Sequence, residues 1–258
     1  MEVSSKFKKV ALQATKEDSQ VLQDNLKKPK KISFKKDISL VTDIDLKAEE
    51  RITKLIKKNF PSHDILTEES GGKIGKKYTW LIDPLDGTTN YLMGIPFFSV
   101  SLALLYKNEP ILGVVLNPCS QELYFAQKNK GAFLNQGRIK ANQNKNLLKS
   151  TLLLSKGREL KSFLKLVKIL SKIGKYIRTV RLLGSSNLGI CQIAAGKADG
   201  YIGIGLPPWD YIVGSFIAQE AGGYVTNFDR GRYNIMRNQN VFVSNKFLHQ
   251  KLLKIFYS

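Results

Sequence analysis

The chain has 258 residues, enough to bury a large core in one domain or in two closely joined ones. Its two cysteines have no zinc or redox-pair spacing, which excludes a disulfide scaffold and favours a reducing cytoplasm. Lys and Arg total 41 against 21 Asp and Glu, a net charge of +20, but the lysines are scattered and follow no aromatic-interleaved RNA-binding pattern. We therefore expect a lysine-rich solvated surface. No apolar run suits a signal peptide or a membrane span, so we expect a soluble cytoplasmic protein with no membrane partner.

The first half of the chain predicts two amphipathic helices and a meander of short strands. Apolar residues recur at helical spacing in two stretches, and alternating or continuous apolar runs mark the strands between turn residues. In the entry to the second helix, Thr42 or Asp43 can serve as the helix cap. The helices are predicted over 7–26 and up to Phe60, and the strands over 37–45, 63–67, 80–82, 97–105, 111–116 and 123–126, with a hairpin-like corner at 132–137.

The stretch 80–90 joins a buried apolar strand to two carboxylates. Pro84 cannot donate a hydrogen bond to a neighbouring strand, so we expect the sheet to stop there and to leave Asp83 and Asp86 on the loop beyond its edge. With the Leu85 carbonyl between them, they form an all-oxygen set suited to Mg²⁺.

A turn that can bind an anion follows at once. Gly87 allows close backbone approach, and Thr88, Thr89 or Asn90 can cap a helical turn whose free N–H groups point at an anion. Asp-Pro and Asp-Gly are also ordinary turn signals, so a plain loop is the alternative. Taken together, the carboxylates and the turn predict a cation site beside a phosphate site.

The second half of the chain alternates strand and helix. The polar stretch 140–150 is the predicted boundary between an α+β domain at 1–145 and an α/β domain at 146–258. Strands are predicted over 152–155, 176–180, 201–204 and 241–244, and helices over 159–173, 185–195, 211–221 and 246–256.

Several motifs resemble the inositol monophosphatase family of Mg²⁺-dependent, lithium-sensitive phosphomonoesterases. The run Asp83-Pro84-Leu85-Asp86-Gly87-Thr88-Thr89-Asn90 resembles its first signature, and Trp209-Asp210 at a helix start resembles its second. Glu68-Glu69-Ser70 is similar to a further family motif. The resemblance covers about residues 35–245. It implies an α/β fold with layers in the order α-β-α-β-α, a small phosphorylated metabolite as substrate, and a homodimer.

The resemblance also implies a role for each matching residue. Two or three Mg²⁺ ions would be held by Glu68, Asp83, Asp86, Asp210 and the Leu85 carbonyl. Thr88 would orient the attacking water together with Glu68, and Asp45 would help to position a water or a weaker metal. The phosphate and substrate contacts would come from Asp86, Gly87, Thr88, Gly184, Ser185 and Ser186. Taken alone, Asp210, Ser185 and Ser186 are also ordinary helix-capping residues.

The substrate stays open because Gly203 stands where many inositol phosphatases carry a Glu that contacts ring hydroxyls. Inositol 1-phosphate or a related sugar phosphate is the first candidate. Fructose 1,6-bisphosphate, histidinol phosphate and a nucleotide such as 3′-phosphoadenosine 5′-phosphate remain alternatives. A regulatory protein that binds RNA or a transcription complex is an alternative of another class, with the net charge as its support. A covalent aspartyl-phosphate route fits less well, because its Asp-x-Asp spacing is absent from this motif.

Overall fold

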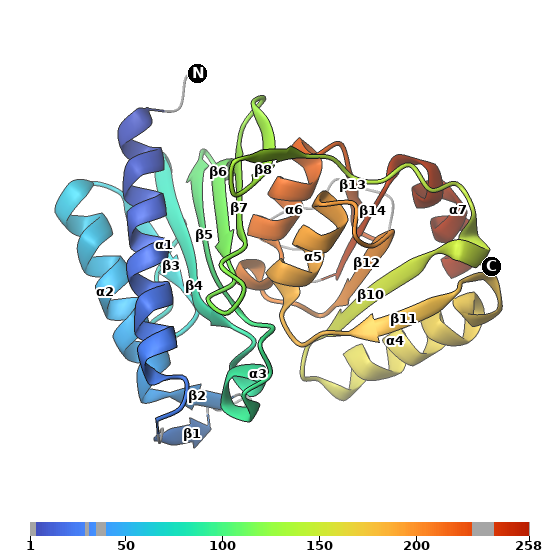
Figure 1. Cartoon of the computed structure of the whole chain (residues 1–258), viewed down its shortest axis with the longest axis horizontal. Coiled ribbons are helices and arrows are strands. Elements are labelled where there is room, and N and C mark those ends of the chain that lie inside the picture. The colour runs from blue at the N-terminus through green and yellow to red at the C-terminus, as the bar shows by residue number, and fades with distance from the viewer. Residues whose placement is uncertain (1–3, 29–30, 35–39, 229–239, 258) are drawn as a thin grey trace.

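The computed structural model describes residues 4–28, 31–34, 40–228 and 240–257, and it shows five layers in the order α-β-α-β-α (Figure 1). A seven-stranded sheet lies between two helical layers, and a five-stranded sheet lies between the second and the third. The helices are α1 (Ser5–Asn25), α2 (Asp43–Asn59), α3 (Thr88–Met93), α4 (Leu160–Ile173), α5 (Ser186–Ala194), α6 (Ile212–Glu220) and α7 (Lys246–Tyr257), with short 3₁₀ turns η1 (Leu147–Lys149), η2 (Gly174–Tyr176) and η3 (Pro208–Asp210). The predicted fold class and layer order are confirmed.

The seven-stranded sheet has the order β3-β4-β5-β6-β7-β8-β9. Only β3 and β4 run parallel, and the remaining neighbours form the antiparallel meander that the sequence predicts. The strands are β3 (Asp64–Thr67), β4 (Tyr78–Asp86), β5 (Ser99–Tyr106), β6 (Glu109–Leu116), β7 (Leu123–Gln127), β8 (Gly131–Leu134) and β9 (Gly137–Ile139).

The prediction that the sheet stops at Pro84 is wrong. Strand β4 continues to Asp86, and its register with β5 shifts so that Asp83 faces Ser101 and Asp86 faces Ser99. The bulge between these pairs lets the ladder skip Pro84, which has no N–H to donate. Both carboxylates therefore belong to the last residues of a buried strand and not to a loop beyond it.

The five-stranded sheet has the order β11-β10-β12-β14-β13, and β10 runs parallel to both of its neighbours. Its strands are β10 (Thr151–Lys156), β11 (Thr179–Leu182), β12 (Gly200–Ile204), β13 (Tyr224–Thr226) and β14 (Asn240–Ser244). The strand predicted at 176–180 begins later, because η2 extends the end of α4 to Tyr176. Strand β13, three residues long, was not predicted.

A small two-stranded sheet precedes α2. The strand predicted over residues 37–45 ends at Thr42, because α2 begins at Asp43. Strand β1 (Ile32–Phe34) pairs with β2 (Leu40–Thr42), and residues 35–39 lie outside the described part of the chain. The strand ends at Thr42 because its side chain caps α2, while Asp45 reaches back to the Thr42 backbone in a capping box.

Three hydrophobic cores follow from the alternation of side chains along the strands. One face of the seven-stranded sheet, with Trp80 and Ile82, packs on α1 and α2, while Leu81 on the other face packs on α5 and α6. The five-stranded sheet contributes Tyr201 and Val243 to that same middle core and packs its far face on α4 and α7. Helices α5 and α6 are thus buried between the two sheets, as Figure 1 shows.

Asparagine side chains tie the predicted boundary segment to the second half of the chain. Asn144 Nδ2 donates to Asp199 Oδ1 at 2.9 Å, and Asn245 Nδ2 donates to Asn142 Oδ1 at 2.8 Å. The segment is therefore fixed against the five-stranded sheet and does not behave as a loose linker. Among the helices that the structure describes, none combines the length and apolar character that crossing a bilayer requires.

Candidate metal centre

Three carboxylates from separate segments converge at the edge of the seven-stranded sheet. Glu68, Asp83 and Asp210 each contribute an oxygen, and these oxygens lie within 4.8 Å of one another. Glu68 follows β3, whose parallel neighbour β4 carries Asp83, and the Glu68 N–H donates to the Ile82 carbonyl at 3.2 Å. Asp210 ends η3, which packs against β4.

A buried glutamate on α2 holds the segment that carries Glu68. The Glu49 carboxylate accepts hydrogen bonds from the N–H groups of Glu69 at 2.9 Å and Ser70 at 3.0 Å. Its side chain is 3% exposed, so this clamp is shielded from water. Sequence reasoning missed Glu49, whose only signal is a charged residue on the buried side of an amphipathic helix.

The Asp83 carboxylate is the best evidence for a cation. Its Oδ1 accepts the Leu85 N–H at 3.1 Å, whereas its buried Oδ2 has no hydrogen-bond partner among the described residues. Burial, followed by the charges of Glu68, Asp86 and Asp210, raises the pKa of Asp83 well above its usual range. A hard cation would both give Oδ2 a partner and offset the repulsion, and the all-oxygen donors suit Mg²⁺. The residues therefore fit the predicted metal.

Asp86 lies next to this cluster but faces the N-terminus of α5. Its Oδ1 accepts the Ser186 N–H at 2.9 Å, and its Oδ2 accepts the Asn187 N–H at 2.7 Å and the Ser185 hydroxyl at 2.8 Å. Burial raises the pKa of Asp86 to about 6, although these hydrogen bonds act in the opposite direction. Asp86 thus supplies the cap that α5 lacks from its own Ser185, and it links the metal cluster to the predicted substrate side.

Asp45 and Thr88, the predicted water-positioning residues, lie side by side. The Thr88 hydroxyl is 3.3 Å from Asp45 Oδ1 and 3.3 Å from the Leu85 carbonyl oxygen. The other Asp45 oxygen accepts the Thr42 N–H at 2.8 Å, so the same carboxylate caps α2 and contacts Thr88. Burial raises the pKa of Asp45, while the hydrogen bonds from Thr42 oppose the shift.

The predicted phosphate turn and substrate turn pack directly against each other. Gly87 has a φ of 103°, and a Cβ on it would lie 3.0 Å from the Gly184 carbonyl oxygen. Gly184 has a φ of 84°, and a Cβ there would lie 2.6 Å from Asn90 Nδ2. Asn90 Nδ2 donates to the Leu183 carbonyl at 2.7 Å. Both glycines are needed for this close approach.

The space beside Gly203 is filled. A Cβ at this position would lie 2.6 Å from Leu206 Cδ1 and 2.9 Å from Val241 Cγ1. The position that carries a carboxylate in many inositol phosphatases is therefore closed here by apolar side chains.

Known proteins are similar to this chain over most of its length. Residues 4–258 match the model of the inositol monophosphatase family. The chain is 38% identical over 220 residues to the Nus factor SuhB of Pasteurella multocida, covering 83% of this chain and 82% of the relative. It is 34% identical over 263 residues to the fructose-1,6-bisphosphatase/inositol-1-monophosphatase of Aquifex aeolicus, covering 99% and 97%. The solved structure of Thermotoga maritima IMPase superposes with a TM-score of 0.88 at 31% identity, covering 95% and 94%.

Replacing Asp83 with Asn should stabilise the metal-free protein and abolish its response to Mg²⁺. The change keeps the size of the side chain but removes one buried negative charge from the cluster. At a Mg²⁺ concentration 100 times its Kd, binding stabilises the wild type by about 2.7 kcal/mol, or a Tm rise of about 5–10 °C. Thermal unfolding in EDTA and in Mg²⁺ measures both effects. Asp24→Asn, on the surface of α1, is the matched control and should respond to Mg²⁺ like the wild type; an equal response from Asp83→Asn would remove Asp83 from the ligand set.

Proposed function

Because the chain belongs to the inositol monophosphatase family, and is therefore a phosphoric monoester hydrolase, we propose that it cleaves a small phosphate monoester by direct attack of a Mg²⁺-activated water. Inositol 1-phosphate or a related sugar phosphate is the first candidate substrate. The observation that carries the proposal is the convergence of Glu68, Asp83 and Asp210 around a buried, unpartnered Asp83 oxygen.

Five groups are available to hold the metal: the carboxylates of Glu68, Asp83, Asp86 and Asp210 and the carbonyl of Leu85. We propose that they bind two or three ions. Sites with two metal ions are common in phosphatases. Bound Mg²⁺ supplies a water of lowered pKa and neutralises charge on the phosphoryl and leaving oxygens. Enzymes accelerate phosphate monoester hydrolysis by up to about 10²¹-fold, whereas a positioned acid or base alone contributes about 10² to 10⁴. Side chains without a metal would leave most of that acceleration unexplained.

The remaining residues would position the water and the phosphate. A hydrogen bond from the Thr88 hydroxyl to Asp45 would leave the Thr88 oxygen free to accept a hydrogen bond from the attacking water. Glu68, on the neighbouring strand end, would take the proton of that water. The N–H groups of Gly87 and Thr88 begin α3 and would donate to the phosphate oxygens.

The substrate alcohol would meet the turn at Gly184, Ser185 and Ser186. This turn lies against Gly87, so a phosphate bound there places its leaving oxygen towards the turn. The apolar packing at Gly203 leaves no carboxylate there to accept hydrogen bonds from ring hydroxyls, so this position gives inositol no advantage over other alcohols. Fructose 1,6-bisphosphate, histidinol phosphate and 3′-phosphoadenosine 5′-phosphate stay in the set of candidates for this reason.

Phosphate release from a panel of these monoesters with Mg²⁺, with EDTA and with added Li⁺ tests the proposal. We expect turnover with Mg²⁺ and none with EDTA, and inhibition by Li⁺. Thr88→Ala should lower kcat by about 10² to 10⁴, because the water loses its orienting hydroxyl. Thr89→Ala removes an exposed neighbouring hydroxyl and serves as the control. Full turnover in EDTA, or a trapped acyl phosphate on the enzyme, would contradict the mechanism.

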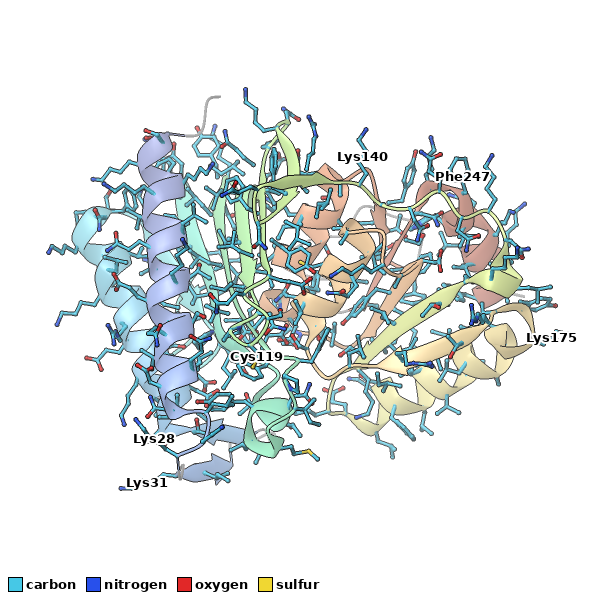
Figure 2. All side chains as sticks on the ribbon, viewed as in Figure 1. Lys28, Lys31, Cys119, Lys140, Lys175 and Phe247 are labelled. Carbon is cyan, nitrogen blue, oxygen red and sulfur yellow. The ribbon has the colours of Figure 1, made fainter. Side chains whose placement is uncertain are left out.

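A second candidate function is RNA binding. Its support is the net charge of +20 and the name Nus factor SuhB carried by similar proteins. Figure 2 shows Lys28 and Lys31, Lys140 and Lys175 at different edges of the molecule, which disperses the positive charge.

This candidate predicts retention of RNA that falls steeply with salt, by about 10³ to 10⁵ in affinity between 50 and 200 mM if 6–10 phosphates are contacted. Filter binding of labelled RNA across that salt range measures it. Asp83→Asn should bind RNA as the wild type does, because the metal cluster is acidic. Absence of binding at low salt would leave hydrolysis as the function of the chain.

We also propose a homodimer, supported by an apolar stripe on α4. Leu160, Phe163, Leu164 and Val167 follow helical spacing and are each 46–69% exposed. Sedimentation at micromolar concentration should show a dimer for the wild type and a monomer for Phe163→Glu with Leu164→Glu. Lys168→Glu, an exposed charge reversal on the same helix, should remain dimeric; a monomeric wild type would end the proposal.

A further inference from the structure

Asn187, the second residue of α5, contacts both halves of the candidate metal centre. Its side chain is 0% exposed, and its hydrogen bonds reach three separate segments of the chain. No catalytic or binding role was assigned to it from the sequence, where it follows Ser185 and Ser186 as an ordinary helix residue.

Towards the seven-stranded sheet, Asn187 contacts the strand end that carries the carboxylates. Its backbone N–H donates to Asp86 Oδ2 at 2.7 Å, and its side-chain Nδ2 donates to Ser101 Oγ at 3.0 Å. Ser101 is the partner of Asp83 across β4 and β5. Asn187 is therefore fixed relative to both carboxylates of β4.

Towards the second half of the chain, the side-chain amide of Asn187 forms hydrogen bonds with residues before and after Asp210. Its Nδ2 donates to the Trp209 carbonyl at 2.6 Å, and its Oδ1 accepts the Gly214 N–H at 2.9 Å. Trp209 directly precedes Asp210, and Gly214 lies in the first turn of α6. The fit is close, because a Cβ on Gly214 would lie 2.8 Å from the Asn187 carbonyl oxygen.

We propose that Asn187 is the positioning residue that sets Asp210 against Glu68 and Asp83. The side-chain amide connects Ser101 on β5 to Trp209 and to Gly214 at the start of α6, and it uses both its donors and its acceptor, while the backbone N–H of the same residue binds Asp86 on β4. Asp210 comes from the other sheet-based half of the chain, so its approach to Asp83 depends on a contact of this kind. The inference rests on the proposed metal-dependent function. It adds the residue that positions Asp210 among the metal ligands.

Binding of Mg²⁺ alone, measured by calorimetry without substrate, tests the inference. Asn187→Asp keeps the side-chain shape but loses the donors to Trp209 and Ser101. We expect the Kd for Mg²⁺ to rise about 10- to 100-fold, as for other residues that orient metal ligands. The added negative charge would by itself strengthen cation binding, so a weaker affinity reports the lost geometry. Partial recovery of kcat at high Mg²⁺ should accompany it.

Asn187→Leu is a second variant that removes the hydrogen bonds without adding charge, and it should weaken Mg²⁺ binding in the same way. Asn245→Leu is the matched control, because Asn245 is equally buried and makes hydrogen bonds to Asn142, Asn144, Phe247 and Leu248 far from the site. It should lower Tm in EDTA while leaving the Mg²⁺ affinity unchanged.

The outcomes separate this inference from the function on which it rests. A wild type that binds no Mg²⁺ would overturn the proposed function and the inference together. A wild type that binds Mg²⁺, with folded Asn187 variants of equal affinity, would overturn the role of Asn187 alone. If both Asn187 variants fail to fold while Asn245→Leu folds, Asn187 serves general stability and the inference is also overturned.

Discussion

Repulsion between neighbouring carboxylates is the constraint on which the structure of this site depends. Glu68, Asp83 and Asp210 bring oxygens within 4.8 Å of one another, and of the three Asp83 is buried while the other two are half-buried. At such short range like charges repel, so the side chains would move apart unless other contacts fixed their backbones. Contacts within the fold supply that support, and a bound cation would offset the repulsion that remains.

The layered architecture explains how the chain can hold such a cluster. Helices α5 and α6 lie between the two sheets and are buried on both sides, so their N-terminal ends are fixed by packing on two surfaces. The N-terminal N–H groups of α5 donate to Asp86, and the N-terminus of α6 follows Asp210, which puts both helix starts at the end of β4. Positive helix ends favour nearby carboxylates, and here they partly offset the repulsion that the cluster creates. Helix α5, whose first N–H groups are capped by Asp86 of β4, also carries Asn187.

The residues with local signals were predictable and those with long-range roles were not. Asp83, Asp86 and the glycine turn follow one another in one short run of the sequence. Strand β3 pairs in parallel with β4, and Glu68 at the end of β3 therefore lies beside them. The continuation of β4 through Pro84 could not be predicted, because a bulge is set by the partner strand and not by the proline. Glu49 gave only the weak signal of a charged residue on the buried side of a helix, and Asn187 gave none. Their partners lie 20 or more positions away, at Glu69 for one and at Trp209 and Gly214 for the other.

Gly203 and the candidate metal ligands lie on different elements, so the residue at position 203 can differ without displacing those ligands. The cluster is anchored to β4, the β3 end and the start of α6, whereas position 203 lies on β12, where Leu206 and Val241 close the space. Filling that space with apolar groups leaves every candidate metal ligand in place and adds no charge near the phosphate turn. In the proposed mechanism the cluster sets the chemistry of phosphate transfer to water, while the turn at 184–186 and the apolar packing beside β12 would contact the alcohol that leaves.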